Sequence, residues 1–233
     1  MEASYKNITY LFIAIFIVVI IGFFNSYFGL FPHFKGLPDM AHLHFIGWLL
    51  WFSLLIIQPL LIQFNKLPIH RLLGKFSYFL APYILLTIIG MIKHSYSIHK
   101  TPYLIATHPP GLYFSMAGAI YFFLFYILAI VNKKNTAFHM RYIIISSLAL
   151  LFPSVDRFFI EELKLGEAGG AFTPLIVLLI IIALIIYDKV KLKKISRPYI
   201  VALIFTLAMD ISIKTFLPSH AWQSIALKIG QYL

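Results

Sequence analysis

Histidines are the residues of this chain best suited to chemistry, and their positions follow the hydrophobic pattern. The sequence contains nine His and no Cys, so a metal ion or haem must be held by His, carboxylate or Met side chains. His44 begins one apolar run, and His70 opens the next run 26 positions later. His108 and His139 stand in the same relation, 31 positions apart. Each interval can cross a hydrocarbon layer of roughly 30 Å at about 1.5 Å per helical residue, which predicts two helical hairpins with matching His.

These hairpins predict two pairs of His, with His44 and His108 near the outer membrane face and His70 and His139 near the inner face. A haem with two axial imidazoles needs one nitrogen from each side of its plane, and pairs on alternate helices supply this. We therefore expect the four His to bind haem b or a transition metal, zinc or iron, for electron transfer or oxidoreduction. The alternative for the inner pair is contact with lipid headgroups, because an Arg stands close to each of these His.

A second hypothesis places a metal ion in a pocket that opens toward the outer face. Ionisable groups cost roughly 3 kcal/mol at the bilayer centre, so they tend to face a cavity or a partner. A cluster of His and carboxylate ligands with an open position for water suits zinc or iron. This predicts a membrane-embedded metal-dependent hydrolase of a lipid-like substrate. Its candidate metal ligands are His42, His44, His94, His108, Asp156 and His220.

The carboxylates Asp156 and Asp210 fall in the outer halves of two apolar runs and are the candidate catalytic or proton-handling groups. A third hypothesis uses Asp210 in the proton relay of a proton-coupled small-molecule carrier, with Pro82 and Pro153 interrupting spans near a cavity. Simple pairing is the structural alternative, because Lys214 follows Asp210 by one helical turn and Asp156 has charged neighbours. The residues leave open whether the chain is an enzyme or a carrier.

The elements that must position these residues are membrane helices. The chain has 233 residues, of which 61% are hydrophobic and only 12% charged, and its mean hydropathy is +0.90. A water-soluble domain is about half apolar and a quarter charged, so this class is excluded. We predict one all-α integral membrane domain over residues 1–233 with seven transmembrane helices. Their expected ranges are 8–28, 41–64, 72–93, 111–132, 140–160, 172–187 and 198–217.

The distribution of Lys and Arg predicts the orientation. Twelve lie on the side that holds the N-terminus and seven on the other side, so the positive-inside rule places the N-terminus in the cytoplasm and the C-terminus outside. The net charge of +11 is dispersed among apolar spans rather than gathered in a soluble region, which argues against a nucleic-acid partner. We expect a multi-pass protein of the bacterial inner membrane, with the lipid bilayer as its partner and an oligomer possible.

The tail after Pro218 has the pattern of a short helix lying on the membrane. Ser219 can cap its N-terminus, and Trp222, Ile225 and Ile229 recur at helical spacing. This predicts an interfacial anchor.

Two resemblances accompany these patterns. The order of His44, His70, His108 and His139 resembles that of the ascorbate-reducible di-haem cytochrome b membrane proteins, whose four ligands come from four consecutive spans and pair alternately. This resemblance implies that the four His ligate two haems. Short sequence motifs in the second, third and fifth spans are similar to those of a family of bacterial polytopic membrane proteins with no assigned chemistry, and they imply only the fold. These motifs are His44 with Trp48 or Trp51, Gln58-Pro-Leu-Leu-Ile62, His70-Arg-Leu-Leu-Gly74-Lys75, His139-Met-Arg141-Tyr142 and Leu151-Phe-Pro153.

Overall fold

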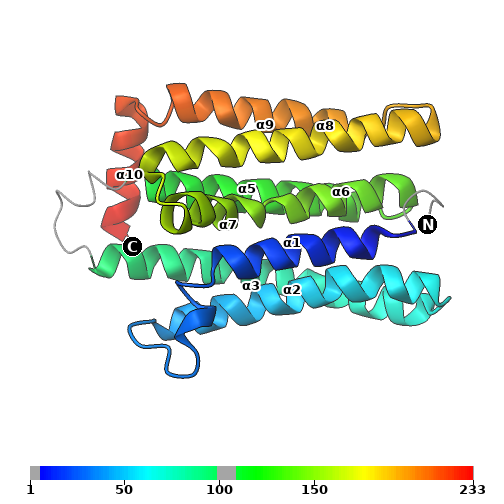
Figure 1. Ribbon diagram of the computed structural model, residues 1–233, viewed down its shortest axis with the longest axis horizontal. Helices are drawn as coiled ribbons and strands as arrows, with labels where there is room; N and C mark the ends of the chain where they lie inside the picture. Colours follow the sequence, from blue (N-terminus) through cyan, green and yellow to red (C-terminus); the bar gives the residue numbers. More distant parts are fainter. Residues whose placement is uncertain (1–5, 99–108, 233) are drawn as a thin grey trace.

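The computed structural model describes residues 6–98 and 109–232, which form helices and no strand. The long helices alternate in direction along one axis, and α10 lies across the end of the bundle opposite the N-terminus (Figure 1). We call these two ends the N-terminal end and the α10 end. The helices are α1 (Ile8–Gly22), α2 (Asp39–Gln63), α3 (Leu67–Ile98), α5 (Pro109–Val131), α6 (Thr136–Leu148), α7 (Leu151–Arg157), α8 (Phe172–Leu192), α9 (Arg197–Thr215) and α10 (His220–Tyr232).

The membrane character predicted from composition is confirmed at the level of the helices. Five stretches in the described part of the chain are long and apolar enough to cross a membrane, and α1 is apolar but shorter. Large apolar side chains remain exposed along the helices, as expected for surfaces that contact lipid. The number of spans and the side on which each terminus lies stay predictions. The five stretches are Asp39–Gln63, Leu67–Ser97, Gly111–Val131, Thr136–Ile160 and Arg197–Thr215.

The first helix is shorter than the sequence pattern predicts, because α1 ends at Gly22 rather than at residue 28. Gly22 lies directly against the backbone of Ser154 on α7, where even a Cβ atom would fall 2.1 Å from the carbonyl oxygen. The aromatic residues that follow continue the apolar pattern but leave the helical path. Tyr27, for example, packs against Phe34 and Phe45 at centroid distances of 5.2 and 4.5 Å.

The predicted fifth span is interrupted near its middle. α6 ends at Leu148 and α7 begins at Leu151. Pro153 has no backbone N–H with which to reach the carbonyl of Ala149, four residues earlier, which favours a break at this point. After α7 the chain widens into a π-helix, η3 (Phe158–Glu162), and then forms the 3-10 helix η4 (Gly166–Ala171).

The core is shared by α1, α2, α3, α5, α6, α7, α8 and α9, and within the hairpins α2–α3 and α5–α6 the two helices pack extensively against each other. A row of aromatic rings runs along the core from the N-terminal half toward the α10 end. Successive ring centroids are 5.4 Å apart from Tyr126 to Trp51, 4.8 Å from Trp51 to Phe122, 5.3 Å from Phe122 to Trp48 and 5.9 Å from Trp48 to His44. Edge-to-face packing of this kind stabilises each pair by about 0.5–1.5 kcal/mol beyond simple burial. We call this set the aromatic row.

The helix predicted for the tail is present as α10, and its predicted cap is confirmed. The backbone N–H of Trp222 donates to the Ser219 Oγ at 3.2 Å. One face of α10, with Trp222 and Ala226, is buried against Tyr113 of α5, and the opposite face is exposed. The apolar face of α10 thus packs against the protein, and its position at the membrane surface stays a prediction.

Candidate functional site

The N-terminal end of the bundle brings together His70 and His139, one from each hairpin. His70 lies in the first turn of α3 and His139 in the first turn of α6. Both helices begin several residues earlier than the sequence pattern predicts, so neither His is outside its helix. Both His therefore lie at the N-terminal end of the bundle, and the charge of His139 acts on His70. The hairpin pattern predicts this inner pair, and its role as a ligand pair stays a prediction.

His139 is oriented by a backbone contact with the preceding helix. Its Nδ1 lies 2.8 Å from the carbonyl oxygen of Ala129 on α5. A carbonyl can only accept a hydrogen bond, so the proton of the neutral ring resides on Nδ1 and Nε2 carries a free lone pair. Metal-ligating His characteristically donates its second ring N–H to a carbonyl or carboxylate in this way. The Asn135 side chain caps the helix start by accepting from the Phe138 N–H at 3.2 Å.

Two polar atoms without partners belong to Gln58 and His70, which are in contact. The Gln58 amide Nε2 on α2 donates to the backbone oxygen of His70 at 3.2 Å. Within the described part of the chain, the Gln58 Oε1 and the His70 Nδ1 are buried without a hydrogen-bond partner. Each buried atom left in this state costs about 1–3 kcal/mol. Such a group is a candidate for contact with something that the protein binds.

An ion pair that sequence reasoning missed lies one turn along α6. Arg141 donates to both carboxylate oxygens of Asp188 on α8, through Nε at 2.7 Å and Nη2 at 3.0 Å. Both side chains have 0% exposure. Arg141 also donates to the carbonyl of Ala137 at 2.9 Å, and its guanidinium lies 5.8 Å from the Tyr199 ring centroid on α9. The pair therefore ties the first turns of α6 to α8 and α9, two residues beyond His139.

The α10 end has a different arrangement around His44. The Trp48 indole N–H donates to the His44 Nε2 at 2.9 Å, and the His44 Nδ1 lies 3.0 Å from the Thr87 Oγ1. Since Nε2 accepts, Nδ1 carries the proton and donates to Thr87, whose own hydroxyl donates to the Ile84 carbonyl. Both nitrogens of His44 are thus occupied. Its predicted partner, His108, lies outside the described residues.

The remaining predicted metal ligands lie on separate elements. The His42 Nδ1 is 2.9 Å from the Tyr27 hydroxyl, and burial raises the pKa of Tyr27, so the phenol keeps its proton. His94 is partly buried near the end of α3, and His220 is exposed at the start of α10. Over residues 6–98 and 109–232, no group of three His, Asp or Glu side chains could hold a metal ion. The described members of the predicted metal set therefore do not form a shared centre.

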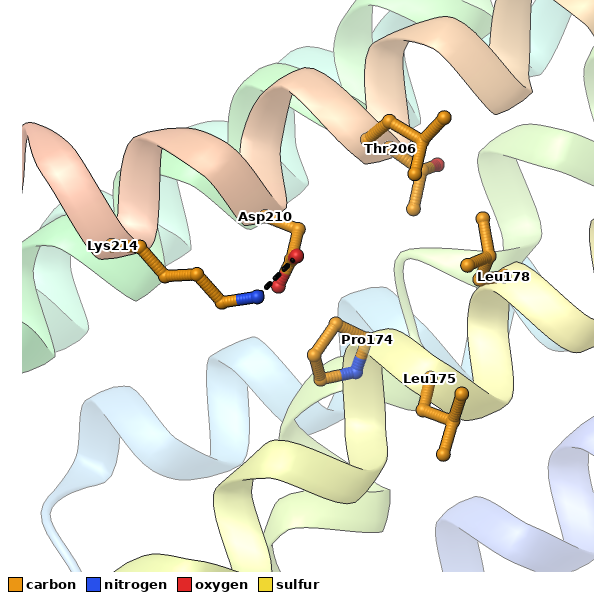
Figure 2. Close-up of a pocket in the computed structure, with 7 residues that line it drawn as sticks. Pro174, Leu175, Leu178, Thr206, Asp210 and Lys214 are labelled. Atoms are coloured by element: carbon orange, nitrogen blue, oxygen red, sulfur yellow. Dashed lines mark hydrogen bonds and ion pairs between the residues drawn. The ribbon is translucent and has the colours of Figure 1, made fainter.

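The two predicted catalytic carboxylates are each bound to a neighbour. Asp156 on α7 accepts a hydrogen bond from the Thr173 hydroxyl on α8 at 2.5 Å. Asp210 on α9 pairs with Lys214, whose Nζ lies 2.8 Å from the Asp210 Oδ2. This i,i+4 pair is the structural alternative that the sequence offered. It lines a groove between α8 and α9 (Figure 2).

No family model, curated protein or solved structure matches this chain. The functional argument therefore rests on the geometry of the residues.

Proposed function

We propose that this chain is an integral-membrane electron-transfer protein that holds a b-type haem at the N-terminal end of the bundle, with His70 and His139 as axial ligands. The observation that carries the proposal is that these two His, from different hairpins, both lie in first helical turns at the N-terminal end of the bundle. His139 offers a free Nε2 because its Nδ1 donates to Ala129, and His70 has a buried ring nitrogen without a partner. Bis-imidazole ligation needs one such nitrogen on each side of the ring plane.

The surroundings support a haem at this position. The chain has no Cys, so the haem would be held by ligation and packing without a thioether bond. The exposed cations Arg71, Lys133 and Lys134 stand beside the two His in sequence and can pair with the haem propionates. The haem supplies a one-electron couple, and the aromatic row leads from this end of the core to His44. The outer pair of His44 with His108 is left out of this proposal, because both ring nitrogens of His44 are occupied by Trp48 and Thr87.

An absorption spectrum of the detergent-purified protein, expressed with added haem precursor, tests the proposal. We expect a Soret band and sharp reduced bands with dithionite, and a low-spin bis-imidazole signal in electron paramagnetic resonance. The variants His70→Ala and His139→Ala are expected to lose this haem, because either change removes an axial nitrogen. His33→Ala is the matched control, since His33 is exposed and lies outside both pairs.

The haem-to-protein ratio measures the occupancy of this site. A ratio of about one in the wild type, which falls close to zero in His70→Ala, supports ligation by the inner pair. A colourless protein, or a Soret band unchanged in both His70→Ala and His139→Ala, would refute the inner site.

A further inference from the structure

The groove between α8 and α9 is open to the surroundings of the bundle and has a cavity volume of about 280 Å³. Leu175 and Leu178 of α8 form one apolar wall (Figure 2). Leu207 of α9 contributes to the other wall. Leu175 and Leu207 are 49% and 42% exposed. The volume lies just below the range of about 300–1,000 Å³ that is typical of small-molecule sites. The groove therefore suits one extended part of an amphiphile rather than a whole enclosed ligand.

The polar end of the groove carries one charge of each sign. Asp210 and Lys214 form the ion pair described above, with side-chain exposures of 32% and 70%. The Lys214 ammonium has three N–H donors, of which the Asp210 Oδ2 takes one. The Asp210 carboxylate also keeps acceptor positions beyond this single bond. Both charges can therefore accept a further partner of opposite sign.

The depth of these residues matches the layers of a membrane leaflet. α9 ends at Thr215, so Lys214 lies in the last turn and Asp210 about 6 Å further in, at about 1.5 Å per residue. Thr206 and Leu207 lie deeper by about another turn. On α8, Leu175 is in the first turn and Leu178 in the second. The charged end thus lies at the level of the headgroups and the apolar walls at the level of acyl chains.

We propose that this groove is a binding site for a phospholipid with a zwitterionic, amine-bearing headgroup. The phosphate pairs with Lys214, the ammonium pairs with Asp210, and one acyl chain lies along Leu175, Leu178 and Leu207. A zwitterion complements both charges of the pair. A purely anionic headgroup complements only Lys214 and is repelled by the adjacent carboxylate of Asp210, so the groove discriminates between the two lipid classes.

Native mass spectrometry of the detergent-purified full chain tests this site. Equal amounts of palmitoyl-oleoyl phosphatidylethanolamine and phosphatidylglycerol are added, and the lipid retained by the protein is measured. We expect several-fold preference for phosphatidylethanolamine. Asp210→Asn is expected to abolish or reverse the preference, because only the cation remains. Lys214→Gln is expected to reduce retention of both lipids several-fold.

Two further variants keep the result interpretable. Lys228→Gln, an exposed cation on α10, is the control and should bind like the wild type. Leu178→Trp fills the apolar part of the groove without touching the charges and should also reduce retention several-fold. Equal retention of the two lipids by the wild type, no retained lipid, or wild-type retention in both Lys214→Gln and Leu178→Trp would overturn the proposal. None of these outcomes depends on haem.

Discussion

The buried ion pair between Arg141 and Asp188 makes a sharp prediction for stability. Both side chains have 0% exposure, and two charge-assisted hydrogen bonds of 2.7 and 3.0 Å join them. Asp188→Asn removes the negative charge and leaves the guanidinium buried without its counter-charge. The amide oxygen of Asn can still accept one of the two hydrogen bonds.

The size of the effect follows from these contacts. Removing one partner of a buried ion pair costs about 3–5 kcal/mol. Because one hydrogen bond survives, we expect Asp188→Asn to lower the free energy of unfolding by about 3 kcal/mol, at the low end of this range. Replacing both partners by apolar residues, as in Arg141→Met with Asp188→Leu, removes the buried charge altogether. This double variant should lie within about 1 kcal/mol of the wild type or above it.

Unfolding in mixed micelles of mild detergent and sodium dodecyl sulfate, followed by far-ultraviolet circular dichroism, measures these differences. Asp210→Asn is the matched control, because the same substitution there breaks a solvent-accessible i,i+4 pair and should cost less than about 1 kcal/mol. The reasoning is refuted if Asp188→Asn and Asp210→Asn have the same small effect, or if the double variant is less stable than Asp188→Asn alone.

Two other predictions concern close contacts in the core. Gly22→Ala should destabilise the protein by about 1–3 kcal/mol or more, since the new Cβ meets the Ser154 backbone. Gly118→Ala is the control and should be neutral or stabilising in the same unfolding assay, because its new Cβ meets no atom within 4 Å. Equal effects of the two substitutions would contradict the packing of α1 on α7. Thr87→Val leaves the Nδ1–H of His44 without its acceptor and should cost about 1–3 kcal/mol, and nitrogen-15 NMR of the imidazole should show a changed tautomer balance; an unchanged His44 spectrum would show that the contact is absent.

The sequence predicted the helices and the ends of the bundle at which the functional side chains lie. Apolar runs set the depth of each residue along its helix, so matching positions in two hairpins place His70 and His139 at the same end of the bundle. The cap at Ser219 was equally local and is confirmed. These predictions needed only the rise per residue and the residue types at helix ends.

The sequence did not predict features that depend on how each helix is rotated about its axis or on which helices pack against it. Asp188 stands among Lys residues at the end of an apolar run, a pattern typical of an exposed charge, yet it faces Arg141, 47 positions away. The end of α1 was also missed, because hydropathy does not register the close approach of Gly22 to Ser154. The groove between α8 and α9 requires the relative rotation of two helices, which periodicity alone does not give.

The aromatic row divides the three Trp residues of the chain into two optical populations. Trp48 and Trp51 belong to the row within the core, while Trp222 belongs to a separate cluster under α10. Trp48 and Trp51 lie nearer to the proposed haem, so excitation energy that they absorb can pass to it. Trp222 stands at the opposite end of the bundle from His70 and His139. Haem uptake at the N-terminal end should therefore quench the emission of Trp48 and Trp51 more than that of Trp222, so intrinsic fluorescence follows cofactor loading without a label.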